Sequence, residues 1–421
     1  MACQIDYLCQ LPDNRERCLA LGSLPPDLKS TYERILSRVD ETNIHVRALV
    51  QRTLRWLIVA KEGLTINALR EALSMKDGTQ KLDRDAVPDE FVLLRSCSSL
   101  VRKSTSGQEL ELAHFTVKEF LLGIDCHSEF SAYRIDVKQS EVESGKACLT
   151  HLTLQDFDSR VSWSREAQLK RFQEYAFRQY SVKHWRSHAR GHLGDADLLA
   201  LTKKLLDPSK PGSFTTWTQD HQYIFKFHED EPRQHGARSI EECQSVYSAI
   251  VTDTPLHYAS ALALPEVCKW LLDCGCDVNL ISRFGSPLNH ALGGPPTLLS
   301  QELASRRCRP VRDKKPLIKV IDILLGAGAD PNCKSSGDYP LHHAFGDLDI
   351  ILQLLQNGAR YTIDNAYRLL YPALNAEIIL KKIGRENLHE DDYAFLLQES
   401  TEEPSFDPDL VAQYSGQYGY S

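Results

Sequence analysis

A glycine followed by a lysine could cradle a nucleotide phosphate, and this chain contains one such pair, Gly145-Lys146. A phosphate-binding loop requires G-x-x-x-x-G-K-[ST], because its backbone amides surround the phosphates and the final hydroxyl binds Mg²⁺. Ser140 stands at the first glycine position and Ala147 replaces the hydroxyl residue. The sequence therefore predicts that this chain does not bind or hydrolyse a nucleoside triphosphate.

Cys274 and Cys276 form a C-x-C pair that could contribute to a metal site. Structural zinc sites need further Cys or His ligands, and no such partner stands at zinc spacing from this pair. The G-x-S-x-G motif is absent, and no Cys/His or carboxylate pair can be joined at catalytic spacing. We therefore expect no catalytic residues, no metal site, no cofactor and no small-molecule substrate.

Composition is that of an ordinary globular protein, with 42% hydrophobic residues, 25% charged residues and a net charge of −8. The negative charge argues against a nucleic-acid binder. No apolar run could span a membrane and no secretory signal is present, so we expect a cytoplasmic protein with free thiols. The basic loop from Arg306 to Lys315 could direct nuclear import or dock nucleic acid, but we favour a solvated loop.

The elements that would position a site are clearest from Asp253 to Asn279, which read as one helix–turn–helix unit. Thr254 can cap a first helix, and Pro255 suits the first helical position. Gly275 can end the second helix in the left-handed conformation. The unit resembles an ankyrin repeat, whose T-P-L-H-x-A opening is present from Thr254 to Ala259.

Two further units follow, opening at Pro287 and Pro340 and ending at Gly328 and Gly358. The second opening lies 32 positions after the first (287 − 255), close to the roughly 33-residue ankyrin period. The second stop lies 53 positions after the first (328 − 275), so about 20 residues are inserted near 294–315. Residues 253–360 are therefore predicted to form a short ankyrin-repeat solenoid.

The N-terminal part predicts helices and one hairpin. Residues 1–44 contain a helical segment whose apolar stripe is Leu28, Tyr32, Ile35, Leu36 and Val39. Between 45 and 125, two short β-type runs, Leu100–Lys103 and Glu109–Ala113, flank a Ser/Gly turn. This order indicates a winged-helix domain, closed by a helix with an apolar stripe of Phe115, Phe120, Leu121 and Leu122.

The motifs L-P-P-D-L-x-x-x-Y-E-R-I-L, W-L-I-V-A-x-E-G-L-T-x-x-x-L-R-E-A-L, C-S-S-L-V and L-A-H-F-T-V-K-E-F-L-L occur in that order. They resemble the segment after the NTPase in fungal NACHT–ankyrin proteins, a winged helix also known from GPI inositol-deacylase. The resemblance implies that the NTPase domain lies upstream of this chain. In related NTPases a winged-helix histidine contacts the nucleotide phosphate, but we favour a structural role for His114.

A DNA-reading winged helix is a further alternative. Arg102 and Lys103 on the wing are opposed by Glu109 and Glu111, so the sequence argues against phosphate contact.

The remaining segments are assigned by composition and pattern. Residues 126–206 resemble the helical connector of the same family, and the Pro-rich, mixed-charge stretch 207–252 is predicted to be a linker. Residues 361–400 are expected to form a helical cap on the repeats, and residues 401–421 a disordered tail. The fold class predicted for the whole chain is mainly α.

These observations favour a non-catalytic scaffold or sensor arm that recognises a partner protein through its repeats. The candidate contacts lie at the connections between repeats, at Arg283, Phe284, Asp338 and Tyr339. The alternative is the regulatory and sensor half of a nucleotide-switched signalling ATPase in non-self recognition. The partner, the oligomeric state and the pathway cannot be read from the sequence.

Overall fold

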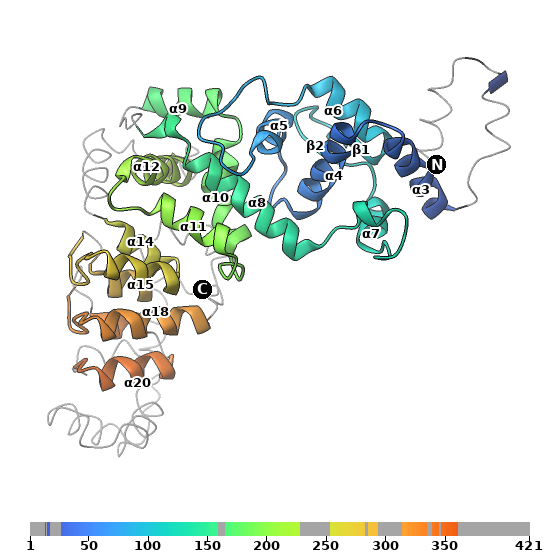
Figure 1. Ribbon diagram of the computed structural model, residues 1–421. Coiled ribbons are helices and arrows are strands. Elements are labelled where there is room, and N and C mark those ends of the chain that lie inside the picture. Colours follow the sequence, from blue (N-terminus) through green and yellow to red (C-terminus); the bar gives the residue numbers. More distant parts are fainter. Residues whose placement is uncertain are drawn as a thin grey trace, which may run out of the picture. The chain divides into compact units, whose positions relative to one another are not determined.

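A computed structural model describes residues 13, 15–16, 27–158, 165–227, 253–282, 285–293, 314–334, 339–344 and 347–360. The chain forms two compact units, Met1–Ile224 and Phe225–Ser421. Both are built mainly from helices, as Figure 1 shows. The predicted cap at 361–400 and tail at 401–421 lie outside the described residues.

The first unit begins with a winged-helix module. Its helices and strands, in chain order, are α3 (Leu28–Asp40), α4 (Ile44–Val59), α5 (Ile66–Ser74), α6 (Glu90–Cys97), β1 (Val101–Lys103), β2 (Leu110–Leu112) and α7 (Phe115–Leu122). A 3-10 turn, η1 (Ser98–Leu100), leads into β1. The two strands pair antiparallel, with Arg102 opposite Glu111, so the predicted hairpin is confirmed.

Two details of the predicted apolar stripes are wrong. Leu28 is exposed, whereas Tyr32, Ile35, Leu36 and Val39 are buried as predicted. In α7 the buried residues are Val117 and Leu121, while Phe115 and Leu122 are exposed. His114 caps this helix, which places Phe115 at the first position and turns it outward.

The described residues that follow in the first unit form α8 (Val137–Leu152), α9 (Arg165–Glu174), α10 (Arg178–Ala189), α11 (Ala196–Leu205) and α12 (Pro211–Phe227), with 3-10 turns η2 (Ser131–Tyr133) and η3 (Gln155–Phe157). Helix α8 packs against α4, α10 and α11 (Figure 1). Gly145 makes this possible, because an added Cβ would lie 3.1 Å from Leu198 Cδ1 and 3.6 Å from the Ala189 nitrogen.

Helix α12 corrects the prediction of a linker from 207 to 252. Residues 211–227 are helical, and Pro211 stands at the start of the helix, where its missing N–H costs nothing. Trp217 is almost fully buried against Trp185, and the remainder of the predicted linker, 228–252, lies outside the described residues.

Buried charges join α12 to the connector. Asp220 is fully buried and accepts hydrogen bonds from Arg171 Nη1 at 2.7 Å and Arg178 Nε at 2.8 Å. Both arginines are also buried. A buried ion is retained only when it is paired, so this carboxylate fixes how α9, α10 and α12 pack.

A second buried carboxylate joins the winged helix to the connector. Glu71 on α5 pairs with Arg84 at 3.0 Å and accepts from the Phe177 amide at 2.9 Å. Burial would raise the pKa of Glu71, but the nearby His151 ring and the Phe177 amide outweigh it, so the pKa is lowered. Folding therefore favours the ionised form of the Glu71 carboxylate.

The second unit repeats one pair of helices. Its helices are α14 (Pro255–Ala261), α15 (Pro265–Asp273), α16 (Pro287–Leu292), α18 (Lys314–Gly326), α19 (Pro340–His343) and α20 (Leu348–Gln356). Helix α14 packs on α16 and α16 on α19, while α15 packs on α18 (Figure 1). The openings predicted at Pro255, Pro287 and Pro340 each begin a helix, as the stacked repeat requires.

Replacing Asp220 with Asn should destabilise the first unit strongly, by about 3–5 kcal/mol, because two buried guanidinium groups lose their counter-charge. Asp197→Asn is the matched control. Its side chain is 81% exposed and pairs with Lys146 at 3.0 Å, so the expected loss is below about 1 kcal/mol. Urea unfolding measures the stability of both variants. Equal losses of stability would contradict the structural role assigned to the buried Asp220.

Candidate functional site

The edge of the repeat stack is built from three equivalent helix ends. Gly275, Gly328 and Gly358 have φ angles of +86°, +89° and +88°, the left-handed conformation that glycine adopts at low cost. The residue after each glycine donates its N–H back to the last turn: the distances are 3.1 Å for Cys276, 3.0 Å for Ala329 and 3.0 Å for Ala359. The loops therefore leave the stack with the same geometry each time.

Asparagine side chains connect these loops to one another. Asn279 Nδ2 donates to the Gly328 carbonyl at 2.9 Å, and its Oδ1 accepts from the Asp330 amide at 2.8 Å. Asn332 repeats the arrangement one unit later, with both distances to Gly358 and Arg360 at 2.8 Å. We call these two residues the asparagine ladder. It satisfies backbone groups along the edge and aligns neighbouring loops.

A second set of equivalent bonds lies at the openings. His257 Nδ1 accepts from the Thr254 amide at 3.1 Å, and Nε2 lies 3.0 Å from the Leu280 carbonyl. In the second unit Asn289 replaces this histidine: its Oδ1 accepts from the Ser286 amide at 3.1 Å. Its Nδ2 donates to the Cys333 carbonyl at 3.4 Å. The asparagine thus makes both bonds that the histidine makes in the first unit.

Of the predicted contacts, Arg283, Phe284 and Asp338 lie outside the described residues. Tyr339 is half-buried, directly before α19, and the Lys334 ammonium lies 5.3 Å from the centre of its ring. That cation–π contact orders the tyrosine against its own loop. The four positions remain predictions as partner contacts.

Two exposed apolar side chains were missed by the sequence reasoning. Leu280 is 41% exposed and Ile281 is 62% exposed, on the loop that follows Asn279. The backbone there is held by the His257 bond to Leu280 and by the Ser282 amide, which donates to the Gly285 carbonyl at 3.0 Å. The sequence signal for this exposed pair is that two adjacent apolar residues stand between the polar loop residues Asn279 and Ser282.

His257 lies in a buried cluster between the first two repeats. Its ring centre is 4.7 Å from that of His290, whose Nε2 lies 3.5 Å from the Asp253 carboxylate. Burial and, next, the charge of His290 lower the pKa of His257 to about 4. The ring is therefore neutral in the folded protein at neutral pH.

The residues considered for chemistry in the first unit have structural positions. Gly145 and Lys146 lie in the middle of α8, and the Lys146 ammonium lies within 3.0 Å of both Asp195 and Asp197. His114 caps α7, accepting from the Thr116 amide at 3.3 Å. Neither arrangement forms a phosphate-binding loop.

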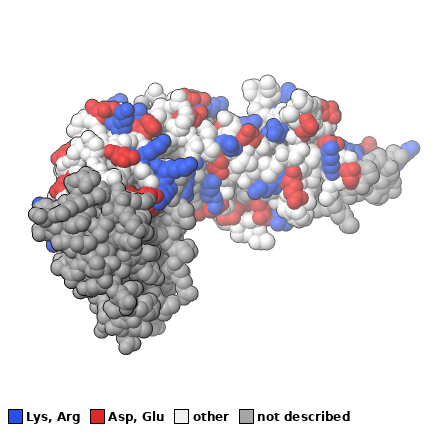
Figure 2. Space-filling model, turned by 90° about the horizontal axis from the view of Figure 1, so that it is seen from below, with Lys and Arg blue, Asp and Glu red and all other residues white. Residues whose placement is uncertain are grey.

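The two basic residues of the wing are paired. Arg102 Nε lies 2.9 Å from Glu111, as expected, whereas Lys103 pairs with Glu90 at 2.8 Å and not with a hairpin residue. Figure 2 shows acidic and basic side chains side by side over most of the described part of one face. Paired cations contribute little to phosphate binding.

The basic loop and the C-x-C pair are only partly described. Lys314, at the end of the basic loop, pairs with Asp347 and Asp349 of the third repeat. Cys274 is exposed and Cys276 half-buried, and both are free.

Family models match one segment in each of the two units. The model of the GPI inositol-deacylase winged helix domain matches residues 38–133, and the ankyrin repeat model matches residues 253–283. The chain thus contains a winged helix of this type and an ankyrin repeat. Ankyrin repeats point to protein–protein interaction in general. Among the described residues, no helix combines the length and apolarity needed to cross a membrane.

The chain is also similar to the azaphilone pigments biosynthesis cluster protein L of Monascus ruber. The two are 26% identical over 271 residues, which cover 61% of this chain and 52% of that protein. The chain thus matches about half the length of this curated relative.

Asn279→Ala should destabilise the repeat stack by about 1–3 kcal/mol, because it removes one donor and one acceptor that serve backbone groups of the next loop. Asn357→Ala is the control, since within the described residues the Asn357 side chain bonds to the Gln353 carbonyl of its own helix and to no neighbouring loop. Thermal unfolding should separate the two variants. A loss confined to Asn357→Ala would contradict the ladder.

His257→Asn should make the repeats more resistant to acid. Between pH 6.5 and about 4 the unfolded histidine binds a proton that the folded one excludes, so His257 lowers stability as pH falls. Asparagine keeps both bonds, as Asn289 shows. Relative to wild type, the variant should gain about 2 kcal/mol between about pH 7.5 and pH 4.5 in urea unfolding. If the stability difference between the variant and wild type did not change with pH, the titration of His257 would not be its cause.

Proposed function

We propose that this chain is a non-catalytic recognition module whose ankyrin repeats bind a partner protein. The binding surface would be the loop edge, by which we mean the edge of the stack formed by the loops that follow Gly275, Gly328 and Gly358. The observation that carries the proposal is the exposed pair Leu280 and Ile281 on a loop whose backbone is held by His257 and Ser282. Apolar side chains on a pre-ordered backbone can be buried by a partner with little loss of conformational entropy.

The predicted contacts fit the same edge. Tyr339 stands at the equivalent connection before α19, and in the sequence Arg283 and Phe284 come two and three residues after Ile281. Aromatic residues and arginine are enriched among interface residues that dominate binding energy. The partner would therefore bury the apolar pair Leu280 and Ile281.

A second candidate is the regulatory and sensor half of a nucleotide-switched signalling ATPase of the NACHT–ankyrin type. The order of a GPI inositol-deacylase winged helix at 38–133 and an ankyrin repeat at 253–283 on one chain supports it. Genomic sequence upstream of the Met1 codon distinguishes the candidates, because an in-frame G-x-x-x-x-G-K-[ST] motif favours the switch. Saturable micromolar ATP binding to this chain would overturn the non-catalytic assignment.

Ile281→Asp should weaken partner binding at least about thirty-fold, because a charge replaces a side chain expected at the interface centre. Ile44→Asp is the matched control, since Ile44 is 66% exposed in the first unit and Ile281 is 62% exposed. Cross-linking and mass spectrometry with the full chain identify the partner and its contact segment. Because the relative is named for a pigment biosynthesis cluster, proteins of pigment biosynthesis belong among the candidates tested.

Both variants should unfold at the same temperature as wild type. A difference in partner binding would then come from the changed surface residue and not from loss of the fold. If wild type and Ile281→Asp bind the partner equally well, the loop edge is not the binding surface. Cross-links to the partner that are confined to residues 27–158 would lead to the same conclusion.

A further inference from the structure

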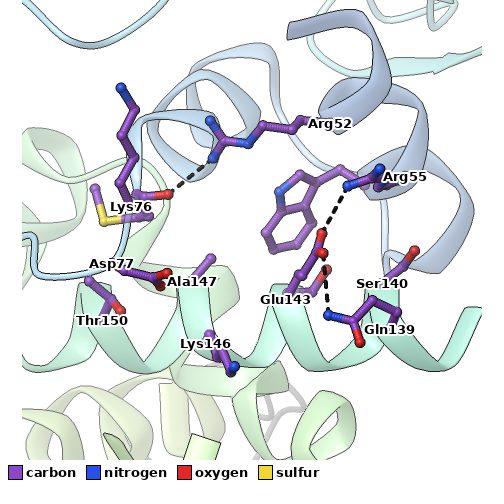
Figure 3. A pocket seen from close by; sticks show the side chains of 13 residues that line it. Arg52, Arg55, Lys76, Asp77, Gln139, Ser140, Glu143, Lys146, Ala147 and Thr150 are labelled. Atoms are coloured by element: carbon purple, nitrogen blue, oxygen red, sulfur yellow. Dashed lines mark hydrogen bonds and ion pairs between the residues drawn. The ribbon is translucent and has the colours of Figure 1, made fainter. Parts of the chain in front are cut away.

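The first unit contains a pocket of about 360 Å³ between α4, the segment after α5, and α8 (Figure 3). Trp56 and Met75, both largely buried, give it apolar walls. Its volume lies at the small end of the range for ligand sites in proteins. The pocket lies within one compact unit and does not involve the repeats.

Two of the basic residues that line the pocket are neutralised by carboxylates. Arg55 Nη1 lies 3.2 Å from Glu143 Oε2, and Figure 3 shows this pair at the pocket's α8 wall. The Lys146 ammonium lies 2.9 Å from Asp195 and 3.0 Å from Asp197. Neither cation needs a ligand to balance its charge.

Arg52 is in a different position. Its guanidinium is half-buried and donates through Nη2 to the Met75 carbonyl at 3.0 Å, as Figure 3 shows. No carboxylate among the described residues lies within ion-pair distance of it. Arginine remains charged in this setting, so the guanidinium lines the pocket with donors that bond to no described residue besides Met75.

Hydroxyl groups on the α8 wall also lack partners. Ser144 is 4% exposed and Thr150 is 6% exposed, and both line the pocket. Neither hydroxyl has a hydrogen-bond partner among the described residues. Neither oxygen is among the buried unpaired atoms, so both hydroxyls reach the solvent in the pocket and are available to hydrogen-bond a polar group of a ligand.

The charges around the pocket limit the ligand. Lys76 stands at its rim without an ion pair in the described part of the chain, but Asp77 is likewise unpaired and offsets it. Glu143 adds a second carboxylate on the opposite wall, already bound to Arg55. A single negative charge facing Arg52 is therefore favoured over the double charge of a phosphate.

We propose that this pocket binds a small organic monocarboxylate with an apolar body. Its carboxylate would pair with Arg52, the hydroxyls of Ser144 and Thr150 would bind polar groups, and the apolar body would pack on Trp56 and Met75. Arg–carboxylate pairing supplies both charge and geometry for such recognition.

Calorimetry on the full chain tests the proposal with benzoate, phenyl phosphate and benzyl alcohol as probes. Benzoate should bind saturably, phenyl phosphate about ten-fold more weakly, and benzyl alcohol not measurably. Arg52→Met should weaken benzoate binding at least about ten-fold. Arg102→Met, an exposed arginine of the wing, is the matched control and should leave binding unchanged.

Ser144→Ala serves if Arg52→Met unfolds, because it removes a hydroxyl that makes no hydrogen bond to a described residue. It should weaken binding of 4-hydroxybenzoate, which has a polar group for this hydroxyl, about three-fold and leave benzoate binding unchanged. Ile281→Asp should bind benzoate as wild type does, which separates this site from the loop edge. Absence of benzoate binding up to about 10 mM, tighter binding of phenyl phosphate, or equal effects of Arg52→Met and Arg102→Met would overturn the proposal.

Discussion

A two-helix repeat can bury its apolar side chains only against another repeat, and this constraint governs the second unit. Leu256, Ala259 and Leu271 of the first repeat are fully buried because α14 and α15 pack on the corresponding helices of the next repeat. The loops that join the helices carry free backbone groups, which the asparagine ladder pairs from one unit to the next. Burial and backbone pairing therefore select the same stacking register, and the exposed loop side chains inherit that order.

The first unit solves a different problem, because its short winged-helix module must be held to a helical connector. Buried carboxylates provide the connections: Glu71 binds the start of α10, and Asp220 holds Arg171 and Arg178. Such pairs contribute little net stability, but misplacing one partner leaves a charge unpaired in the interior. Their main effect is therefore to select one arrangement of the helices, and their contribution to the stability of that arrangement is small.

Local chemistry allowed much of this fold to be predicted from the sequence. Pro255 and Pro287 mark helix starts, and Gly275 marks a helix end, since each residue type suits one backbone position. The reasoning failed where a residue type has two uses. The proline content that predicts a linker includes Pro211, although proline also begins helices, and the buried Trp217 that stabilises α12 carries no positional signal.

The candidate sites were less predictable because they depend on tertiary structure. The pocket joins Arg52, Met75 and Ser144 from segments far apart in the chain, and no sequence spacing relates them. The exposure of Leu280 and Ile281 depends on how the loop leaves the stack. By contrast, the exchange of His257 for Asn289 could be aligned from sequence, but only the shared bonds explain why it is tolerated.

The asparagine ladder also has a mechanical consequence. Asn279 ties the first loop to the second, and Asn332 ties the second to the third, so the joints are arranged in series. A force applied along this edge would load both joints equally, so the weaker joint would break first and release a single unit while the other stayed closed. The solenoid would then yield stepwise under tension, peeling from one end.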